Sequence, residues 1–364
     1  DLFINKSESF ENYYSQYYIL AITLLIFSII SFKLSKKFLT NITLSLISFF
    51  FGLYLIELYL SYNYHYKQKT INIDLKNYNQ LNKFDLYLKL KKEGKDIVPR
   101  IDPNTYFTVE VHLNKKNFFP LSGISNKETL SCNELGYYSK YKSDKYGFNN
   151  NNSSWNNNNI DIVLIGDSFA NGSCVNRENN VGDNLIKDDL SVINLGFPGN
   201  GPLIELASLK EYAPRKFKNV VWLYYEGNDL KDLEVEEKND LLLSYLLDKN
   251  FKQNLKDKQK SIDFFLEKKL VNIVNKEHLK KDLNQNMYDF LVSKEGKKFD
   301  FLRFIKLYTL REITINSFFG IKLNKNFEKI ILEAKSFADE NNAKFLFVYL
   351  PEHTRFTKKI YNMN

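Results

Sequence analysis

Four short apolar runs, separated by segments with helical spacing, mark the second half of the chain. They read "IDIVLIG" (160–166), "LSVINLG" (190–196), "NVVWLYYEG" (219–227) and "AKFLFVYLP" (343–351). Continuous apolar runs of this length are typical of parallel strands buried on both faces of a sheet. Helical patterns lie between them, at 176–188, 202–213 and 326–341. The alternation predicts an α/β fold with a doubly wound parallel sheet, in which ligands bind at the carboxyl ends of the strands.

Two other regions flank or interrupt this alternation. Residues 65–159 are mixed and polar, which predicts an extracytoplasmic connector with short strands before a main domain at 160–364. In the connector, "SDKYGFNN" predicts a turn capped by Asp144 or Asn149, and "NNNSSWNNNN" predicts a surface loop. Leu, Lys, Phe and Asp recur at helical spacing after the third apolar run, as in "IDFFLEKKLVNIVNKEHLKKDL". We expect a helical insertion there, at about 233–325, that covers the strand ends like a cap.

Two longer apolar runs, 17–34 and 39–60, come first in the chain. Each is close to the roughly 20 residues that cross a bilayer as a helix, so residues 1–64 are predicted to be a membrane anchor with two transmembrane helices. Glu57 lies near the end of the second run, where a charge can reach the interface. The short loop between the runs is basic and contains Lys33, Lys36 and Lys37. The alternative is a buried helical hairpin of a soluble protein.

The basic loop also predicts the topology. Cytoplasmic loops are enriched in Lys and Arg, so the loop is expected in the cytoplasm and the long C-terminal part outside it, in the periplasm of a bacterium with the anchor in its inner membrane. In that oxidising compartment Cys132 and Cys174, the only cysteines, are expected to form a disulfide. Two unpaired buried thiols are the alternative.

The net charge of +8 comes from 51 Lys and Arg against 43 Asp and Glu, spread along the chain rather than gathered in a stripe. Nucleic-acid binding needs a basic patch or a known module, and neither appears, so we expect no nucleic-acid partner. No His and Cys spacing typical of a metal site occurs, and the sequence predicts no cofactor.

Three of the four strand ends carry a shared chemical theme. The first ends in Gly166-Asp167-Ser168, the second runs on through "NLGFPGNG" (194–201), and the third continues into "EGND" (226–229). Acyl transfer needs a nucleophile and hydrogen-bond donors aimed at the oxyanion of the transition state. A serine at a strand-to-helix turn, a glycine that lets a backbone N–H approach closely, and an asparagine amide supply these groups. Asp167 and Asp229 are predicted to be helix caps or loop supports.

In this order and spacing, "GDSFANG", "NLGFPGN" and "EGNDL" resemble blocks I, II and III of the SGNH (GDSL-type) hydrolases. The resemblance implies a flavodoxin-like three-layer α/β/α sandwich. It implies that Ser168 is the nucleophile and that Gly199 and Asn228 complete an oxyanion hole with the Ser168 N–H. The activities of the family are those of esterases, lipases, thioesterases, deacetylases and O-acyltransferases. The expected substrate is therefore an O-acyl ester, such as an O-acetyl ester of a cell-surface glycan or a lipid.

The sequence departs from the family pattern at its base. Block V of the family is Asp-x-x-His, but the residues three positions before the four histidines are Tyr62, Val109, Asn275 and Leu350. We expect that block beyond residue 364. His353 follows the fourth strand and is a weaker candidate for the base, because the triad also needs an orienting carboxylate and the adjacent Glu352 is expected to point away. Arg355 is a candidate contact to substrate or a support of its loop.

Two rival hypotheses remain open at this point. The chain could be a non-catalytic, membrane-tethered module that binds glycans or acts as a scaffold on an SGNH fold. It could also be a transporter-coupled acyltransferase, which requires further membrane helices upstream of Asp1.

Overall fold

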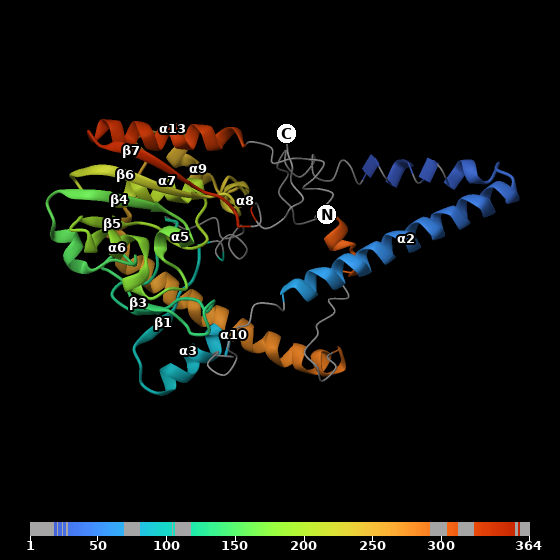
Figure 1. The fold of residues 1–364 in the computed structure, drawn as a ribbon, viewed down its shortest axis with the longest axis horizontal. Helices are drawn as coiled ribbons and strands as arrows, with labels where there is room; N and C mark the ends of the chain where they lie inside the picture. The colour runs from blue at the N-terminus through green and yellow to red at the C-terminus, as the bar shows by residue number, and fades with distance from the viewer. Residues whose placement is uncertain are drawn as a thin grey trace. The chain divides into compact units, whose positions relative to one another are not determined.

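Four parallel strands form the main sheet in the computed structural model (Figure 1). Across the sheet they lie in the order β5 (Val192–Asn194), β4 (Ile160–Gly166), β6 (Phe217–Tyr225) and β7 (Lys344–Leu350). The structure describes residues 18–19, 21–23, 25–26, 28–68, 81–103, 105, 118–291, 304–311, 324–353 and 356. They fall into two compact units, one of residues 1–72 with 297–321 and the other of residues 73–296 with 322–364. The predicted α/β fold with a parallel sheet is confirmed at this level.

Helices cover both faces of this sheet. On one face lie α7 (Pro202–Tyr212), which is buried at every position, and α13 (Lys325–Glu340), whose buried stripe is Ile330, Ala334 and Ala338. On the other face, α5 (Ser168–Asn171) and α6 (Val181–Lys187) pack over the smaller apolar cluster that contains Leu164. The chain places β5 on one side of β4 and then returns to place β6 on the other side of β4. The strand order therefore reverses between β4 and β6, and the helices before and after β5 lie on opposite faces of the sheet. Such reversal points are where open α/β sheets bind ligands.

The connector residues pack against the main sheet domain within the second unit. Helix α3 (Lys83–Lys92) leads into a three-stranded sheet in which β1 (Ile97–Pro99) is parallel to β2 (Glu128–Leu130) and β3 (Lys140–Lys142) is antiparallel to it. The Asp144 carboxylate accepts hydrogen bonds from the backbone N–H groups of Tyr146 and Phe148, so Asp144 organises the predicted turn. The polar run after it contains the 3-10 helix η1 (Asn152–Asn156), and Asp144 also accepts from the Trp155 indole.

The predicted insertion is helical but packs differently from our expectation. It contains α8 (Asp229–Glu236), α9 (Asp240–Leu247), the 3-10 helix η3 (Leu255–Lys258) and the long helix α10 (Gln259–Leu291). In α10 the residues Ile262, Leu266, Leu270 and Val274 recur every fourth position and are buried. This stripe joins the core next to the connector, where Asp263 accepts hydrogen bonds from Ser125. The described part of α10 therefore supports the connector, and the prediction that it caps the strand ends is wrong for this helix.

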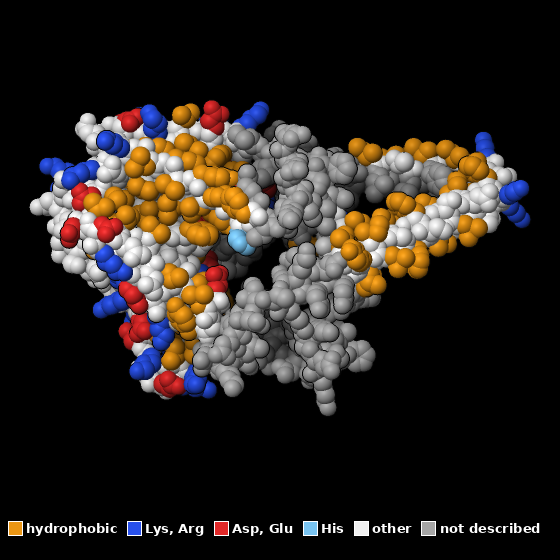
Figure 2. Space-filling model, viewed as in Figure 1, with side chains coloured by type: hydrophobic (Ala, Val, Ile, Leu, Met, Phe, Trp, Pro, Cys, Tyr) orange, Lys and Arg blue, Asp and Glu red, His pale blue; other side chains and the backbone are white. Residues whose placement is uncertain are grey.

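The first unit contains one helix that is long and apolar enough to cross a membrane, within its described residues, whereas the sequence predicted two. It is the Lys36–Ser61 part of α2 (Lys36–Gln68). Its apolar side chains, such as Phe49 and Leu55, are exposed in the structure, and Figure 2 shows apolar side chains along the rod. The described apolar helix of the first run covers only Ala21–Ser31.

Candidate active site

The candidate nucleophile Ser168 stands at the first position of α5, separated from the end of β4 by Asp167. Gly166 has a φ of 146°, and a Cβ there would lie 2.7 Å from the Leu223 carbonyl oxygen of the neighbouring strand β6. A glycine is therefore required for the chain to turn this close to β6. Asp167 caps α5 by accepting a hydrogen bond from the Phe169 N–H at 2.9 Å, which confirms its predicted role as a cap. The side chain of Ser168 is half-buried beside it.

Asp167 brings two of the predicted site residues together. The Ser168 hydroxyl donates to the Asp167 carboxylate over 3.1 Å. Burial raises the pKa of Asp167, and hydrogen bonds from the Phe169 N–H and from the side chains of Ser168 and Asn228 oppose this rise. Since Ser168 follows β4 and Asn228 follows β6, the two residues meet where the strand order reverses. The nucleophile and the amide donor are thus neighbours around one buried carboxylate.

The loop after β5 is joined to the same strand end. The Phe197 N–H donates to the Gly166 carbonyl oxygen over 3.2 Å. Pro198 and Gly199 form the centre of a β-turn closed by a 3.2 Å bond from the Asn200 N–H to the Phe197 carbonyl, and Gly199 has a φ of 77°. A proline followed by a residue with positive φ is the signature of a type II turn, which requires glycine at that place. The sequence thus places Gly199 on a rigid turn next to the nucleophile strand.

Gly196, in the same loop, sets how closely α5 approaches. A Cβ on Gly196 would lie 2.4 Å from the Ala170 Cβ and 2.7 Å from the Asn171 nitrogen. The Asn171 amide donates back to the Gly196 carbonyl over 3.2 Å. The helix that begins with Ser168 therefore rests directly on the backbone of the β5 loop, and only a glycine at position 196 permits this contact.

Asn228 ends the β6 loop and is the residue before α8. Its Nδ2 donates to Asp232 over 2.7 Å. A primary amide has two N–H donors, and the Asn228 amide is shared between the carboxylates of Asp232 and Asp167. The following residue, Asp229, accepts from the Tyr225 N–H at 2.7 Å, which makes it the loop support that the sequence predicted.

Buried carboxyl groups lie behind these loops, and sequence reasoning missed most of them. Glu236 accepts from three backbone N–H groups at the start of α7, among them that of Leu203 at 2.9 Å, and Glu205 accepts from the Trp222 indole. Burial is the main cause that raises the pKa of Asp229 to about 9 and the pKa of Glu236 to about 8, and it raises the pKa of Glu205 well above its usual value. In the sequence, only Glu205 and Glu211, within the apolar pattern of 202–212, hinted at buried acids.

These acids do not form a metal centre among the described residues, where no group of three or more His, Cys, Asp and Glu is placed to hold an ion. Within the same residues, Glu205 and Asp229 each keep one buried carboxyl oxygen without a hydrogen-bond partner. After burial, the charge of Asp229 is the next cause that raises the pKa of Glu205, and the charge of Asp167 is the next cause that raises the pKa of Asp229. Protonation at neutral pH relieves this repulsion. Asp229 and Glu236, whose pKa values are raised to about 9 and about 8, are therefore mostly neutral at pH 7.

An aromatic pair borders the nucleophile on its exposed side. The rings of Phe169 and Tyr225 pack with their centroids 4.6 Å apart, and Phe169 is 46% exposed. The Tyr225 ring lies against Gly227, where a Cβ would meet its hydroxyl at 2.7 Å. This pair links the loop that carries Ser168 to the loop that carries Asn228 and gives the site one apolar wall.

A disulfide and an arginine attach the connector to the loop after Ser168. Cys132 and Cys174 are bonded in the structure, which is the pairing expected from the sequence. The buried Arg100 guanidinium donates to Ser131 at 2.5 Å and to Ser173 at 3.0 Å, and it is paired with Asp102 at 2.6 Å. The loop that follows α5 is therefore held from the connector side by one covalent and several polar contacts.

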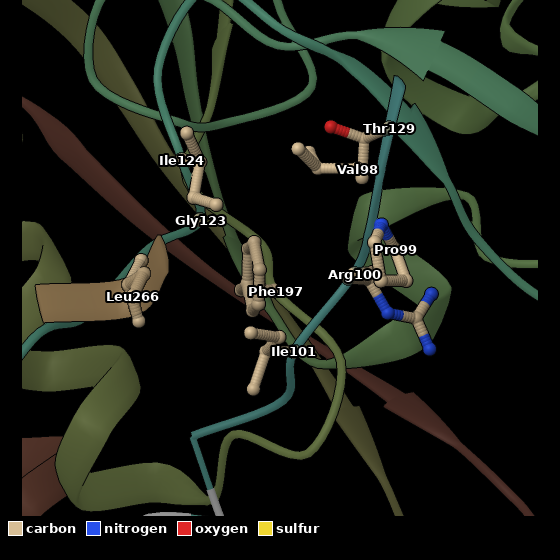
Figure 3. Close-up of a pocket in the computed structure, with 9 residues that line it drawn as sticks. All are labelled: Val98, Pro99, Arg100, Ile101, Gly123, Ile124, Thr129, Phe197 and Leu266. Carbon is tan, nitrogen blue, oxygen red and sulfur yellow. The ribbon is translucent and has the colours of Figure 1, made fainter. Parts of the chain in front are cut away.

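The same contact region contains a small cavity behind Phe197. It measures about 10 Å³, enough for one water molecule, and is lined by apolar side chains of β1, the β2 region and α10, with Phe197 on its inner side (Figure 3). In the close-up the Arg100 guanidinium points away from Phe197. The cavity is a packing gap beneath the Gly199 turn and is too small to take a substrate.

The fourth strand end holds the remaining predicted residues. Glu352 is half-buried, and its N–H donates to the Glu226 carboxylate at 2.9 Å. Burial, followed by the charge of Glu352, raises the pKa of Tyr225. His353 is exposed. Arg355 and His112 lie outside the described residues, as do the side chains of His65 and His278.

Comparison of the chain with family models, with curated proteins and with solved structures finds no match. A function for this chain is therefore inferred from the site itself and from the sequence blocks that form it.

Proposed function

We propose that this chain is a membrane-anchored serine esterase or O-acyltransferase of the SGNH type. The observation that carries the proposal is the meeting of Ser168 and Asn228 at Asp167, next to the Gly199 turn. These are the three residues for which the sequence blocks imply a nucleophile and two oxyanion donors. The strand order β5-β4-β6-β7 agrees with the flavodoxin-like sandwich that the resemblance implies.

In the proposed mechanism the Ser168 Oγ attacks the ester carbonyl carbon and transfers its proton to a general base. The N–H groups of Ser168 and Gly199 and the Asn228 amide stabilise the oxyanion. Collapse breaks the ester bond, the base returns the proton to the departing alcohol, and the acyl group remains on Ser168. Water then completes hydrolysis, or the hydroxyl of an acceptor completes transfer. By resemblance the base is the histidine of an Asp-x-x-His block.

The location of the reaction is part of the proposal. Lys36–Ser61 is long and apolar enough to act as an anchor. Lys33, Lys36 and Lys37 lie at its start, and the positive-inside rule places them in the cytoplasm. The site then faces the outside, where O-acyl esters of surface glycans and lipids occur.

One observation favours a second candidate function, a non-catalytic glycan-binding module. Within the described residues the Ser168 hydroxyl is hydrogen-bonded to Asp167 and not to a histidine. A serine without a basic partner is a weak nucleophile. In that case the three strand ends would bind an acylated glycan without cleaving it.

Replacement of the nucleophile in the full-length protein separates the two functions. We expect Ser168→Ala to lower turnover of a short-chain ester by on the order of 10⁴-fold or more and to abolish labelling by a fluorophosphonate. Ser336→Ala, on α13, removes a bond to Glu340 and serves as the matched control. Wild-type turnover in Ser168→Ala, or labelling that maps elsewhere, contradicts Ser168 as the nucleophile, whereas absence of both turnover and labelling in the wild type leaves the binding module.

A further inference from the structure

Residues 304–311 return from far along the chain to contact α2 inside the first unit. The Tyr54 hydroxyl donates to the Ile305 carbonyl oxygen over 3.1 Å, and the Tyr54 ring packs on Phe304 with centroids 5.3 Å apart. Further along α2, the Ser61 hydroxyl lies 3.4 Å from that of Thr309. The contact therefore extends over about two turns of α2, from position 54 to position 61.

Glu57 is the centre of this contact. Its side chain is fully buried, and its two carboxylate oxygens accept hydrogen bonds from the backbone N–H groups of Thr309 at 2.9 Å and Leu310 at 2.7 Å. A carboxylate in the apolar part of a membrane helix is costly unless it finds a polar partner. Both N–H groups belong to the first turn of a short helical segment, where backbone donors lack partners within the helix. Each side of the contact thus satisfies the polar groups of the other.

The position of Glu57 places this contact at one boundary of the membrane. Glu57 lies four residues before Ser61, where the apolar span ends, so it is about 6 Å from that end. The span begins at its other end with Lys36 and Lys37, and Figure 2 shows basic side chains there. Residues bound to Glu57 are therefore held at the level of the lipid headgroups on the side opposite the lysines.

We propose that residues 304–311 are a second membrane contact of this protein, seated in the lipid headgroup region and held there by Glu57. The exposed side chains of the segment fit that partner. Ile305 and Tyr308 are 45% and 41% exposed, and Lys306 and Arg311 are exposed as well. Apolar and tyrosine side chains with basic neighbours are typical of segments that lie in the interface, where the basic groups meet lipid phosphates. The chain thus meets the bilayer twice, before the connector and again between β6 and β7.

This inference rests on the proposed membrane anchor, and the test keeps the two apart. Cys132 and Cys174 are joined, so a single new cysteine is the only free thiol for a spin label. The full chain is placed in phosphatidylcholine–phosphatidylglycerol nanodiscs with a label at Phe49→Cys, Ile305→Cys or Leu332→Cys. Phe49 lies near the middle of the span, and Leu332 is an exposed apolar residue of α13 in the other unit. Collision rates with oxygen and with a water-soluble nickel chelate report the depth.

We expect the Phe49→Cys label in the hydrocarbon, the Ile305→Cys label about 5–10 Å below the headgroup surface, and the Leu332→Cys label in water. A label at Phe49→Cys that is in water overturns the anchor itself. A label at Phe49→Cys in lipid with one at Ile305→Cys in water overturns the second contact and leaves the anchor intact.

The role of Glu57 is tested in the same nanodiscs. Glu57→Ala is expected to move the Ile305→Cys label into water while the Phe49→Cys label keeps its depth. If Glu57→Ala does not insert, Tyr54→Phe removes only the hydroxyl bond to Ile305 and is expected to give a smaller shift in the same direction. Oxidation of a Tyr54→Cys, Phe304→Cys double variant should cross-link the two segments, seen as a loss of about 2 Da in the intact mass, because a disulfide needs close Cβ atoms. An unchanged depth at Ile305→Cys in Glu57→Ala contradicts the proposed role of the carboxylate.

Discussion

The carboxyl ends of β4, β5 and β6 are bound to one another, whereas the carboxyl end of β7 stands more openly beside them. The β5 loop donates to the end of β4, and Asp167 joins the β4 and β6 loops. At β7, the Glu226 N–H donates to the Leu350 carbonyl and the Glu352 N–H donates to the Glu226 carboxylate, but His353 beyond them is exposed. The side chains of β7 from Leu346 to Tyr349 are 37–49% exposed too.

This contrast shows which strand ends hold their hydrogen-bonding groups in fixed positions before any substrate binds. Donors that stabilise an oxyanion must be fixed before the reaction, because reorganisation during the reaction costs the energy they would supply. The first three strand ends meet this condition with glycine-dependent turns and buried hydrogen bonds. The fourth strand end contributes a carboxylate near Tyr225 and an exposed imidazole. The oxyanion half of the proposed site is therefore built into the sheet, and the base half is not built from the described residues.

Among the predictions that test this contrast, the largest effect is expected at Asn228, the proposed oxyanion donor after β6. We expect Asn228→Ala to lower kcat on a short-chain ester by about 10²- to 10³-fold, because one fixed oxyanion donor is lost, with KM changed much less. Steady-state kinetics on the full-length protein measures this. Asn341→Ala, which removes a bond from the end of α13 to the Phe337 carbonyl, is the control and should retain wild-type kcat. A loss in Asn228→Ala that appears only in KM would show that the amide binds substrate and transition state equally.

The buried acids behind the three strand ends predict a pH dependence of stability. Burial raises the pKa of Asp229 to about 9 and the pKa of Glu236 to about 8, compared with ordinary carboxyl values near ~4 in an unfolded chain. The folded state therefore holds protons that the unfolded state has lost, and the free energy of unfolding falls as pH rises from about 4 to about 9. Each group contributes about 1.4 kcal/mol per pH unit over which only the folded state keeps its proton, so the melting temperature should fall by on the order of ten degrees between about pH 6 and pH 9.

Asp229→Asn is expected to flatten this dependence, since its amide cannot ionise. Melting temperatures of the wild type and the variant across the same pH range give the comparison, with Asp339→Asn on the exposed face of α13 as the control. Parallel curves for wild type and Asp229→Asn would mean that Asp229 is not protonated in the folded state.

Local patterns explain why the sheet was predictable from the sequence. The apolar run at 160–166 is β4 to the residue, because a strand buried on both faces has few polar positions to blur its ends. The run at 190–196 shrinks to Val192–Asn194, since Leu195 and Gly196 already belong to the loop that supports α5. The residues of the three sequence blocks could be placed together because parallel strands end at one edge.

Contacts between distant segments explain what the sequence did not predict. Arg100 and Glu236 have no local pattern, and their roles depend on Ser173 and on the start of α7. Glu57 has the sequence context of a charge near the membrane interface, yet it binds the backbone of Thr309 and Leu310. The first apolar run has the composition of a span, and its described residues include an apolar helix at Ala21–Ser31.

At β7, by contrast, we expect only a small effect on catalysis. His353 lies on the ligand side of the sheet, but its side chain is exposed and no aspartate stands three residues before it. Glu352, the adjacent residue, is half-buried, and its backbone N–H donates to the Glu226 carboxylate. His353 does not match the Asp-x-x-His pattern that the resemblance implies for the base, so we expect His353→Gln to change kcat/KM by less than about threefold, within the range of an exposed substitution.

A loss in His353→Gln as large as that of Ser168→Ala would make His353 the base and place both halves of the site on the described strands. The pH profile of kcat/KM provides a second readout for the same variant. Removal of the base abolishes the limb near the imidazole pKa, whereas removal of an exposed residue leaves that limb in place. If His353→Gln keeps the limb of the pH profile near the imidazole pKa, the base is another residue. The proton of the Ser168 hydroxyl must then still be accepted by a group that titrates near that pKa.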